Sequence, residues 1–234
     1  MTATNGRCVL LFTRSPELEG KAKGLFEERA VFEIARRRVA SAAATLPDVA
    51  LVVAGGGPAP AGSRRLAQRG GCFGERLEHA LEDARSLGYT SVVVVPSDVP
   101  ALSAAHLAAA FDALALGATP LGPSPDGGVY LIGVDTRALA PFSGVRWRTA
   151  HVLADLLALL ARRGSRAVLL APLRDVDAPR DLAALARERL DPELDRLLRA
   201  LLARVPERPD RRSATPLPAA ARSSAPRAPP ALAA

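Results

Sequence analysis

Hydrophobic and polar positions fall in blocks along this chain of 234 residues. The most uniform apolar block lies in residues 91–100, SVVVVPSDVP, which contain four consecutive valines. A β-branched run without polar alternation is typical of a strand that is buried on both faces of a parallel sheet. Pro96 and Pro100 cannot donate ladder hydrogen bonds, so we expect a central strand that ends at Pro96 and leaves Asp98 in a turn.

Other apolar blocks alternate with stretches of helical periodicity. Further strands are predicted at 7–12, 49–54, 129–134 and 167–170. Apolar positions at helical spacing predict helices that begin near Phe26, Gly74, Ser103, Thr149, Asp177 and Asp191. The segment 13–23 is predicted to be a loop, and 118–128 a Pro- and Gly-rich loop. Successive strand–helix units favour an α/β fold with a mostly parallel sheet, in which strand 129–134 is inserted or antiparallel.

The composition fits one domain followed by a tail. Apolar residues make up 49% of the chain, which is enough for one sizeable core. We therefore predict a domain over 1–205 and a disordered Pro/Ala/Arg-rich tail over 206–234. The chain contains no apolar run long enough to span a membrane and no signal-type N-terminus, which predicts a cytoplasmic protein without membrane insertion.

Charge and cysteine content exclude several classes of function. The net charge is +7, but five arginines lie in the tail, and aromatic residues make up only 4% of the chain. This combination predicts no nucleic-acid partner, because stacking platforms are scarce. Cys8 and Cys72 form no CxxC motif and have no neighbouring histidine, so neither a zinc site nor a disulfide framework is indicated.

Two features of the sequence suggest phosphate chemistry. Ligands of open α/β sheets bind beyond the carboxyl ends of the strands, where Asp98 could hold a divalent cation beside a phosphate. Lys21 and Lys23 are the only lysines among 31 basic residues, and both follow the first strand. An ammonium is a common point-charge partner of phosphate. The alternatives are that Asp98 caps the next helix and that the lysines lie in a solvated basic loop.

Several segments, taken together, resemble one family. They are FTRSP (12–16), GGCFGERL (70–77), SDVPAL (97–102), LGPSPDGGVYLIG (121–133), WRT (147–149) and DVDAP (175–179). Their order is similar to that of the bacterial GT-A-like glycosyltransferases associated with arsenosugar biosynthesis, long grouped as a domain of unknown function. The most specific part is the LGPxxDGGxYLIG pattern. Related nucleotidyltransferases share the general layout.

The resemblance implies a three-layer GT-A/Rossmann-like fold of the nucleotide-diphospho-sugar transferase type, with a mostly parallel sheet and flanking helices. It also implies a nucleotide at the carboxyl edge of the sheet and a catalytic Mg²⁺ or Mn²⁺ bound by Asp98. The residues expected to contact the nucleotide are Thr13, Arg14, Lys21, Lys23 and Ser97.

The resemblance further implies that Asp126 is catalytic, as a second metal ligand or as a contact to the acceptor. The residues expected on the acceptor side are Gly127, Gly128, Trp147 and Thr149. Without the resemblance, Asp126 and Gly127 indicate an ordinary turn. Asp175 and Asp177 are interpreted as helix caps or as outer partners of the metal.

The function implied is a metal-dependent glycosyltransferase that uses a nucleotide-sugar donor and a small-molecule acceptor. The alternatives are a nucleotidyltransferase that releases pyrophosphate and a noncatalytic nucleotide-binding module. Three departures from the family pattern bear on this choice. A single acid, Asp98, stands where a D-x-D would supply two, PELEGKAKGL replaces PxPGxVKTRL after the first strand, and Cys72 stands where an acid commonly follows the paired glycines.

Overall fold

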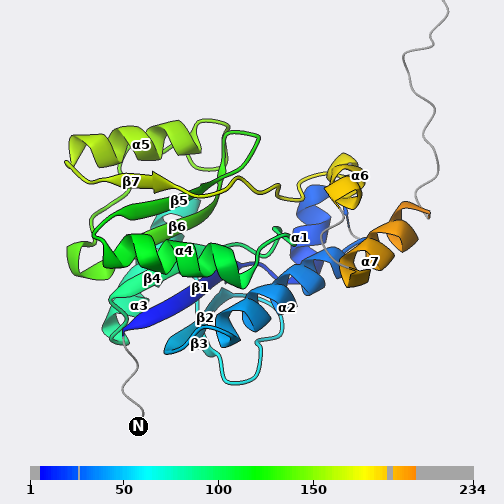
Figure 1. The fold of residues 1–234 in the computed structure, drawn as a ribbon, viewed down its shortest axis with the longest axis horizontal. Coiled ribbons are helices and arrows are strands. Elements are labelled where there is room, and N and C mark those ends of the chain that lie inside the picture. The colour runs from blue at the N-terminus through cyan, green and yellow to red at the C-terminus, as the bar shows by residue number, and fades with distance from the viewer. Residues whose placement is uncertain (1–5, 26, 189–191, 204–234) are drawn as a thin grey trace, which may run out of the picture. The chain divides into compact units, whose positions relative to one another are not determined.

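A seven-stranded sheet organises the residues that the structure, a computed structural model, describes (Figure 1). These are residues 6–25, 27–188 and 192–203. The strand order is β3-β2-β1-β4-β6-β5-β7. The strands are β1 (Arg7–Thr13), β2 (Val49–Gly55), β3 (Arg64–Leu66), β4 (Ser91–Val95), β5 (Thr119–Pro123), β6 (Val129–Asp135) and β7 (Ala167–Leu169). The predicted tail, 206–234, lies outside the described residues.

The strand pairing confirms the predicted α/β architecture. β1 pairs in parallel with β2 and β4, β2 with β3, and β5 with β7. β6 runs antiparallel to both of its neighbours, β4 and β5. The valine run is therefore the central strand of the sheet, and the strand predicted at 129–134 is the antiparallel one. Most strands consequently end at the same edge, which we call the carboxyl edge.

Helices cover both faces of the sheet and bury alternate side chains of β1. Val9 and Leu11 face α2 and α4, whereas Cys8, Leu10 and Phe12 face α3. α5 packs on β5 and β6. The sheet is thus the middle of three layers, and the core is divided between its two faces. The helices are α1 (Pro16–Lys23), α2 (Ala30–Ala44), α3 (Phe73–Ser86), α4 (Ala104–Ala115), α5 (Val152–Arg162), α6 (Pro179–Glu188) and α7 (Pro192–Leu202).

The segment after β1 forms helix α1, so the prediction of a loop over 13–23 was wrong. The Ser15 side chain accepts a hydrogen bond from the Leu18 amide at 3.3 Å, and Pro16 occupies the first turn. Gly24, in the left-handed conformation at φ 67°, ends the helix. These are ordinary start and stop signals, and they outweigh the weak apolar periodicity of this short segment.

Two strands and one helix boundary also differ from the predictions. β5 contains Pro120 and Pro123 and was predicted as part of a loop, whereas β3, which is short and polar, was not predicted at all. α5 begins at Val152 rather than next to Thr149, whose hydroxyl instead accepts from the His151 amide at 3.2 Å. The two strands form because distant strands pair with them.

At the carboxyl edge, the start of α2 packs against α6 and α7 through a separate apolar cluster (Figure 1). Val176 is fully buried in this cluster, next to residues 175 and 177. The cluster therefore anchors the segment between β7 and α6 beside the end of β4. None of the described helices is long and apolar enough to cross a membrane.

Candidate functional site

Asp98 lies in the turn that follows β4, as predicted, and its side chain is 15% exposed. Its carbonyl oxygen accepts from the Val176 amide at 2.8 Å, which ties the turn to the segment before α6. The next helix, α4, is capped by Ser103, whose hydroxyl lies 2.7 Å from His106 Nδ1. The Asp98 carboxylate is therefore free of the capping role that was its alternative interpretation.

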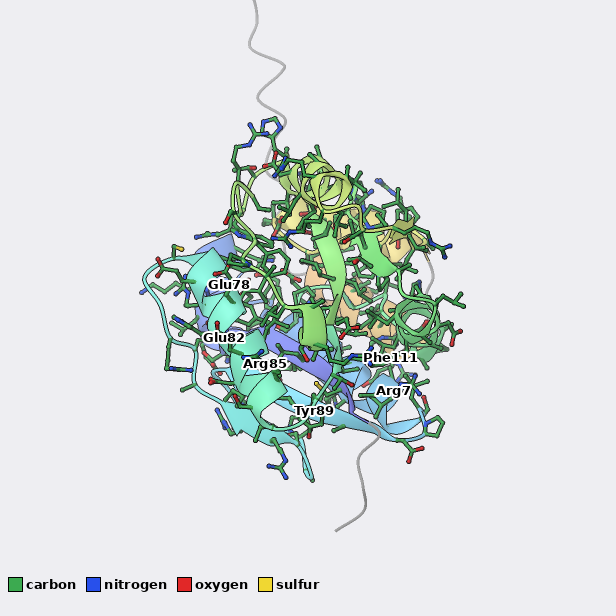
Figure 2. The ribbon with its side chains drawn as sticks, turned by 90° about the vertical axis from the view of Figure 1, so that its left-hand side faces the viewer. Arg7, Glu78, Glu82, Arg85, Tyr89 and Phe111 are labelled. Atoms are coloured by element: carbon green, nitrogen blue, oxygen red, sulfur yellow. The ribbon has the colours of Figure 1, made fainter. Side chains whose placement is uncertain are left out.

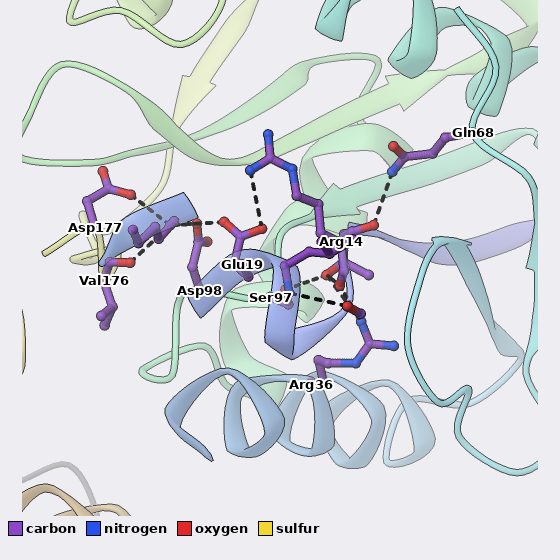
Figure 3. Close-up of polar contacts among 12 residues, drawn as sticks. Arg14, Glu19, Arg36, Gln68, Ser97, Asp98, Val176 and Asp177 are labelled. Atoms are coloured by element: carbon purple, nitrogen blue, oxygen red, sulfur yellow. Dashed lines mark hydrogen bonds and ion pairs between the residues drawn. The ribbon is translucent and has the colours of Figure 1, made fainter. Parts of the chain in front are cut away.

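Lys23, in the last turn of α1, contacts a cluster of oxygen atoms at this edge. Figure 3 labels the residues that supply them, Glu19, Asp98, Val176 and Asp177. Its Nζ donates to Asp98 Oδ2, lies 2.7 Å from Asp177 Oδ1, and donates to the Val176 carbonyl at 2.9 Å. Glu19 Oε1, one turn earlier in α1, lies 3.4 Å from the same nitrogen. An ammonium has three N–H donors, so these contacts use all of them.

The charges of this cluster keep Lys23 protonated. Burial disfavours the ammonium, but the carboxylates of Asp98 and Asp177 outweigh that effect and raise its pKa. Asp98 nevertheless remains half satisfied, because its Oδ1 is buried without a hydrogen-bond partner among the described residues. The same holds for Ser124 Oγ, at the end of β5. A buried oxygen without a partner costs about 1–3 kcal/mol, which a bound ligand would recover.

Asp126, Asp175 and Asp177 form a second group of acids at the same edge. Ligand oxygens of these three residues lie within 4.8 Å of one another. Burial raises the pKa of Asp175 to about 7, and the negative charges of Asp98, Asp177 and Asp126 act in the same direction. Asp126 is thus grouped with Asp175 and Asp177, and Asp98 lies close enough to act on Asp175 electrostatically.

Local contacts explain how these acids are held. Asp126 Oδ1 accepts from the Gly128 amide at 2.9 Å, so Asp126 does form the ordinary turn that was its alternative interpretation. At the start of α6, the Asp181 carboxylate accepts from the amides of Asp177 and Ala178 at 3.0 and 2.8 Å. Capping of α6 is therefore performed by Asp181, which leaves the Asp177 carboxylate for Lys23.

This set of donors fits a hard divalent cation. Carboxylate oxygens are the ligands that suit Mg²⁺ and Mn²⁺, and three of the acids already bring such atoms together. Burial first, and then the charges of the neighbouring acids, raise the pKa of Asp175, and Oδ1 of Asp98 is a further oxygen without a partner among the described residues. A bound cation would offset the repulsion among these acids and give Oδ1 of Asp98 a partner.

Arg36 is a residue of this edge that the sequence reasoning missed. It lies on α2, is 4% exposed, and donates to Thr13 Oγ1 at 3.1 Å, to the Arg14 carbonyl at 3.2 Å and to the Pro58 carbonyl at 2.7 Å (Figure 3). The Thr13 hydroxyl is in turn hydrogen-bonded to Ser97 Oγ. Thr13 and Ser97 are both buried, so they link the ends of β1 and β4 and position their neighbours.

A signal for Arg36 was present in the sequence. Phe32, Arg36, Val39 and Ala43 follow each other at i, i+4, i+7 and i+11, and all four are buried on α2. An arginine within an apolar stripe indicates a buried cation. In the structure, burial lowers the pKa of Arg36, and the charge of Arg65 acts in the same direction.

Arg14 and Lys21, the other basic residues predicted to contact the nucleotide, are more exposed than Lys23. Arg14 is 38% exposed, and its guanidinium lies 3.9 Å from Glu19. Lys21 is exposed. Residues two positions apart on a helix point in nearly opposite directions, so α1 directs Lys23 toward the acids and Lys21 away from them.

The residues predicted on the acceptor side serve packing contacts in the structure. Gly127 has φ 89°, and a Cβ there would lie 2.2 Å from the Ala150 carbonyl oxygen, so the close approach that it permits is that of its own chain. The Trp147 ring lies 5.1 Å from Phe73 and 5.6 Å from Phe142, centroid to centroid. Thr149 is exposed and donates to the Arg146 carbonyl at 2.7 Å.

Comparisons with known proteins support the fold described above. A family model described as "Uncharacterized protein conserved in bacteria (DUF2064)" matches residues 28–149. A search of curated proteins finds no match. Among solved structures, a protein from Desulfovibrio desulfuricans G20, assigned provisionally as a nucleotide-diphospho-sugar transferase, is 26% identical with a TM-score of 0.70. The match covers 83% of this chain and 97% of that chain, and it confirms the predicted fold type.

More distant structures are also similar. Rv0371c from Mycobacterium tuberculosis H37Rv is 19% identical with a TM-score of 0.48, over 81% of this chain and 98% of that chain. Glucosyl-3-phosphoglycerate synthase from Mycobacterium tuberculosis, solved with Mn²⁺, uridine diphosphate and phosphoglyceric acid, is 17% identical with a TM-score of 0.47. That match covers 86% of this chain and 78% of that chain.

Proposed function

The chain belongs to the DUF2064 family, and from the geometry of its carboxyl edge we propose that it is a metal-dependent glycosyltransferase that uses a nucleotide-sugar donor. The observation that carries the proposal is that Lys23 forms ion pairs with Asp98 and Asp177, and that Asp177 is grouped with Asp126 and Asp175. An ammonium that can donate hydrogen bonds to phosphate and several carboxylates that can bind a metal ion, all at one sheet edge, are the groups that a metal-bound diphosphate requires. The similarity to the Desulfovibrio protein supports the same class of donor.

Each side chain would have a defined task. Asp98, together with oxygens from Asp126, Asp175 and Asp177, would hold Mg²⁺ or Mn²⁺, which when bound neutralises charge on the leaving diphosphate. Lys23 would donate to a non-bridging phosphate oxygen. Thr13 and Ser97, linked to Arg36, would fix the ends of β1 and β4 against which the nucleotide lies.

The reaction would break the bond between the anomeric carbon and the phosphate oxygen, and the electron pair would leave with the nucleoside diphosphate. The oxygen of an acceptor hydroxyl would form the new bond to the anomeric carbon, and its proton would pass to solvent. We assign the acceptor side to Gly128, whose amide donates to Asp126, and to Trp147 and Thr149. The acceptor would be a small molecule, and the sequence resemblance makes arsenosugar biosynthesis the first setting to test. Action in the cytoplasm stays a prediction of the sequence.

A nucleotidyltransferase is the second candidate. The turn after β4 supplies one acid, Asp98, instead of the two of a D-x-D, and enzymes that join a nucleoside triphosphate to a phosphorylated substrate share the general layout of the resemblance. Such an enzyme would release pyrophosphate rather than a nucleoside diphosphate. The same residues would hold the metal and the phosphates in both cases.

Product analysis separates the two candidates. The purified protein is incubated with Mn²⁺ and either a panel of UDP-, GDP-, CDP- and ADP-sugars or the four NTPs with sugar phosphates. We expect release of free nucleoside diphosphate in the first panel. Pyrophosphate release in the second panel alone would select the nucleotidyltransferase.

Thermal shift tests whether the site binds nucleotide at all. We expect Mn²⁺ together with the preferred nucleoside diphosphate to raise the melting temperature of the wild-type protein, since a ligand of the folded state stabilises it. Asp98→Asn is expected to lose this shift, whereas Asp112→Asn, which removes an exposed charge on α4, is expected to keep it. No stabilisation by any nucleotide in either protein would contradict both transferase proposals and leave a noncatalytic domain.

A further inference from the structure

The ammonium of Lys23 occupies the same carboxylates that the proposed metal would use. Its Nζ contacts Asp98 Oδ2 and lies 2.7 Å from Asp177 Oδ1, and its side chain is 12% exposed. Two cations within a few ångströms of each other repel strongly in a partly buried site. A divalent cation therefore cannot bind at Asp98 while Lys23 keeps its present position.

Lys23 also has no donor left for a phosphate in this arrangement. Its three N–H groups are used by Asp98, Asp177 and the Val176 carbonyl, and Glu19 lies 3.4 Å away. To bind a donor phosphate, the ammonium must release at least one of these three oxygen partners. For Lys23, binding a diphosphate and losing one of these contacts are thus the same event.

We propose that Lys23 is an internal cation that holds Asp98 and Asp177 in the nucleotide-free protein and transfers to the donor phosphate when the nucleotide binds, so that the divalent cation enters with the nucleotide and not before it. The identity of the ligand rests on the proposed function. The competition between Lys23 and a cation rests only on the contacts described above. Lys23 is in this sense a positioning residue that sets the order of binding.

Mn²⁺ alone is the first probe, with free Mn²⁺ measured by electron paramagnetic resonance. We expect weak binding to the wild-type protein and at least tenfold tighter binding to Lys23→Met, because the competing charge is gone. Lys21→Met removes the same charge from the same helix, on its exposed side, and is expected to bind Mn²⁺ as the wild type does. Equal affinity in Lys23→Met and Lys21→Met, or no binding by either, would overturn the proposal.

Two further variants test whether a change in Mn²⁺ affinity comes from misfolding or from a cation bound at another site. Lys23→Gln keeps a hydrogen-bond donor at similar length, and circular dichroism shows whether each variant is folded. The tighter binding is expected in Lys23→Gln as well. In Lys23→Met/Asp98→Asn the gain is expected to disappear. A gain that survives the loss of the Asp98 charge would place the cation elsewhere and contradict the proposal.

UDP and GDP at saturating concentration are the second probe. The proposal predicts that the nucleotide that binds raises the Mn²⁺ affinity of the wild-type protein at least tenfold, and that of Lys23→Met much less. An equal increase in both proteins would contradict the transfer of Lys23. If neither nucleotide nor any other nucleoside diphosphate binds, the proposed function fails, while the result with Mn²⁺ alone still decides whether Lys23 competes with a cation.

Discussion

The two edges of the sheet differ in how completely their polar groups are satisfied. At the amino edge, Thr136 is fully buried and its hydroxyl donates to the Tyr89 carbonyl at 2.6 Å. The Arg7 guanidinium covers the Phe111 ring, 4.4 Å from its centroid (Figure 2). At the carboxyl edge, Asp98 Oδ1 and Ser124 Oγ are buried without a partner among the described residues.

This difference separates stability from function. The amino edge is closed by its own contacts, so substitutions there should change the free energy of unfolding. The carboxyl edge keeps like charges together and leaves buried oxygens without partners, which costs stability and favours a ligand. Substitutions there should change ligand binding, and those that leave the carboxylates without their cation should change the free energy of unfolding as well.

The largest effect is expected for Asp98→Asn. Loss of the carboxylate removes a metal ligand, and an effect of about 4 kcal/mol on the transition state corresponds to roughly a thousandfold loss of kcat/KM. Steady-state kinetics with the preferred donor measure it, and Asp112→Asn is the control. Activity within threefold of wild type would remove Asp98 from the site.

Lys23→Met is expected to destabilise the protein in EDTA by about 2–3 kcal/mol. The substitution leaves the carboxylates of Asp98 and Asp177 without their cation, and breaking a largely buried pair from one side is costly. Urea unfolding measures the change, and Mn²⁺ should restore part of the lost stability. If Mn²⁺ stabilises the variant no more than the wild type, the acids do not form a cation site.

Thr136→Val tests the amino edge. The substitution leaves the buried Tyr89 carbonyl without its hydroxyl partner, which should lower the free energy of unfolding by about 1–2 kcal/mol. Nucleotide affinity should stay unchanged. A loss of nucleotide binding in a folded variant would show that the two edges are not independent.

The pH dependence of stability reports on Asp175. Its pKa of about 7 in the folded protein exceeds the value near 3.9 of an unfolded aspartate. Between these values the folded chain binds more protons, so this residue makes the free energy of unfolding fall as pH rises, by less than about 1.4 kcal/mol per unit. Urea unfolding in EDTA from pH 4 to 7 should show a smaller fall in Asp175→Asn. An unchanged slope would contradict this assignment.

The sequence predicted the parts of the fold that local chemistry determines. The valine run and the two prolines around Asp98 defined the central strand, its end and the placement of one acid. The Pro- and Gly-rich break before 129–134 indicated the inserted or antiparallel strand, and the family resemblance added Asp126 as a candidate site residue. These features depend on side-chain type and short spacing, which are visible in a single chain.

The missed features depend on distant partners. β5 contains prolines and forms a strand only because β6 and β7 pair with both of its sides. The site itself joins Lys23 to Asp98 and Asp177, which are 75 and 154 positions away in the chain. Periodicity could not indicate which acid Lys23 would meet, nor that Arg36 would link β1 to the loop at Pro58.

Anomalous diffraction from a crystal grown with Mn²⁺ and the preferred nucleoside diphosphate tests the central claim most directly. We predict one manganese peak bound by Asp98 and at least one of Asp126, Asp175 and Asp177, with Lys23 moved from Asp98 to a phosphate oxygen. A nucleotide bound elsewhere, or a peak away from these carboxylates with Lys23 still on Asp98, would contradict the account.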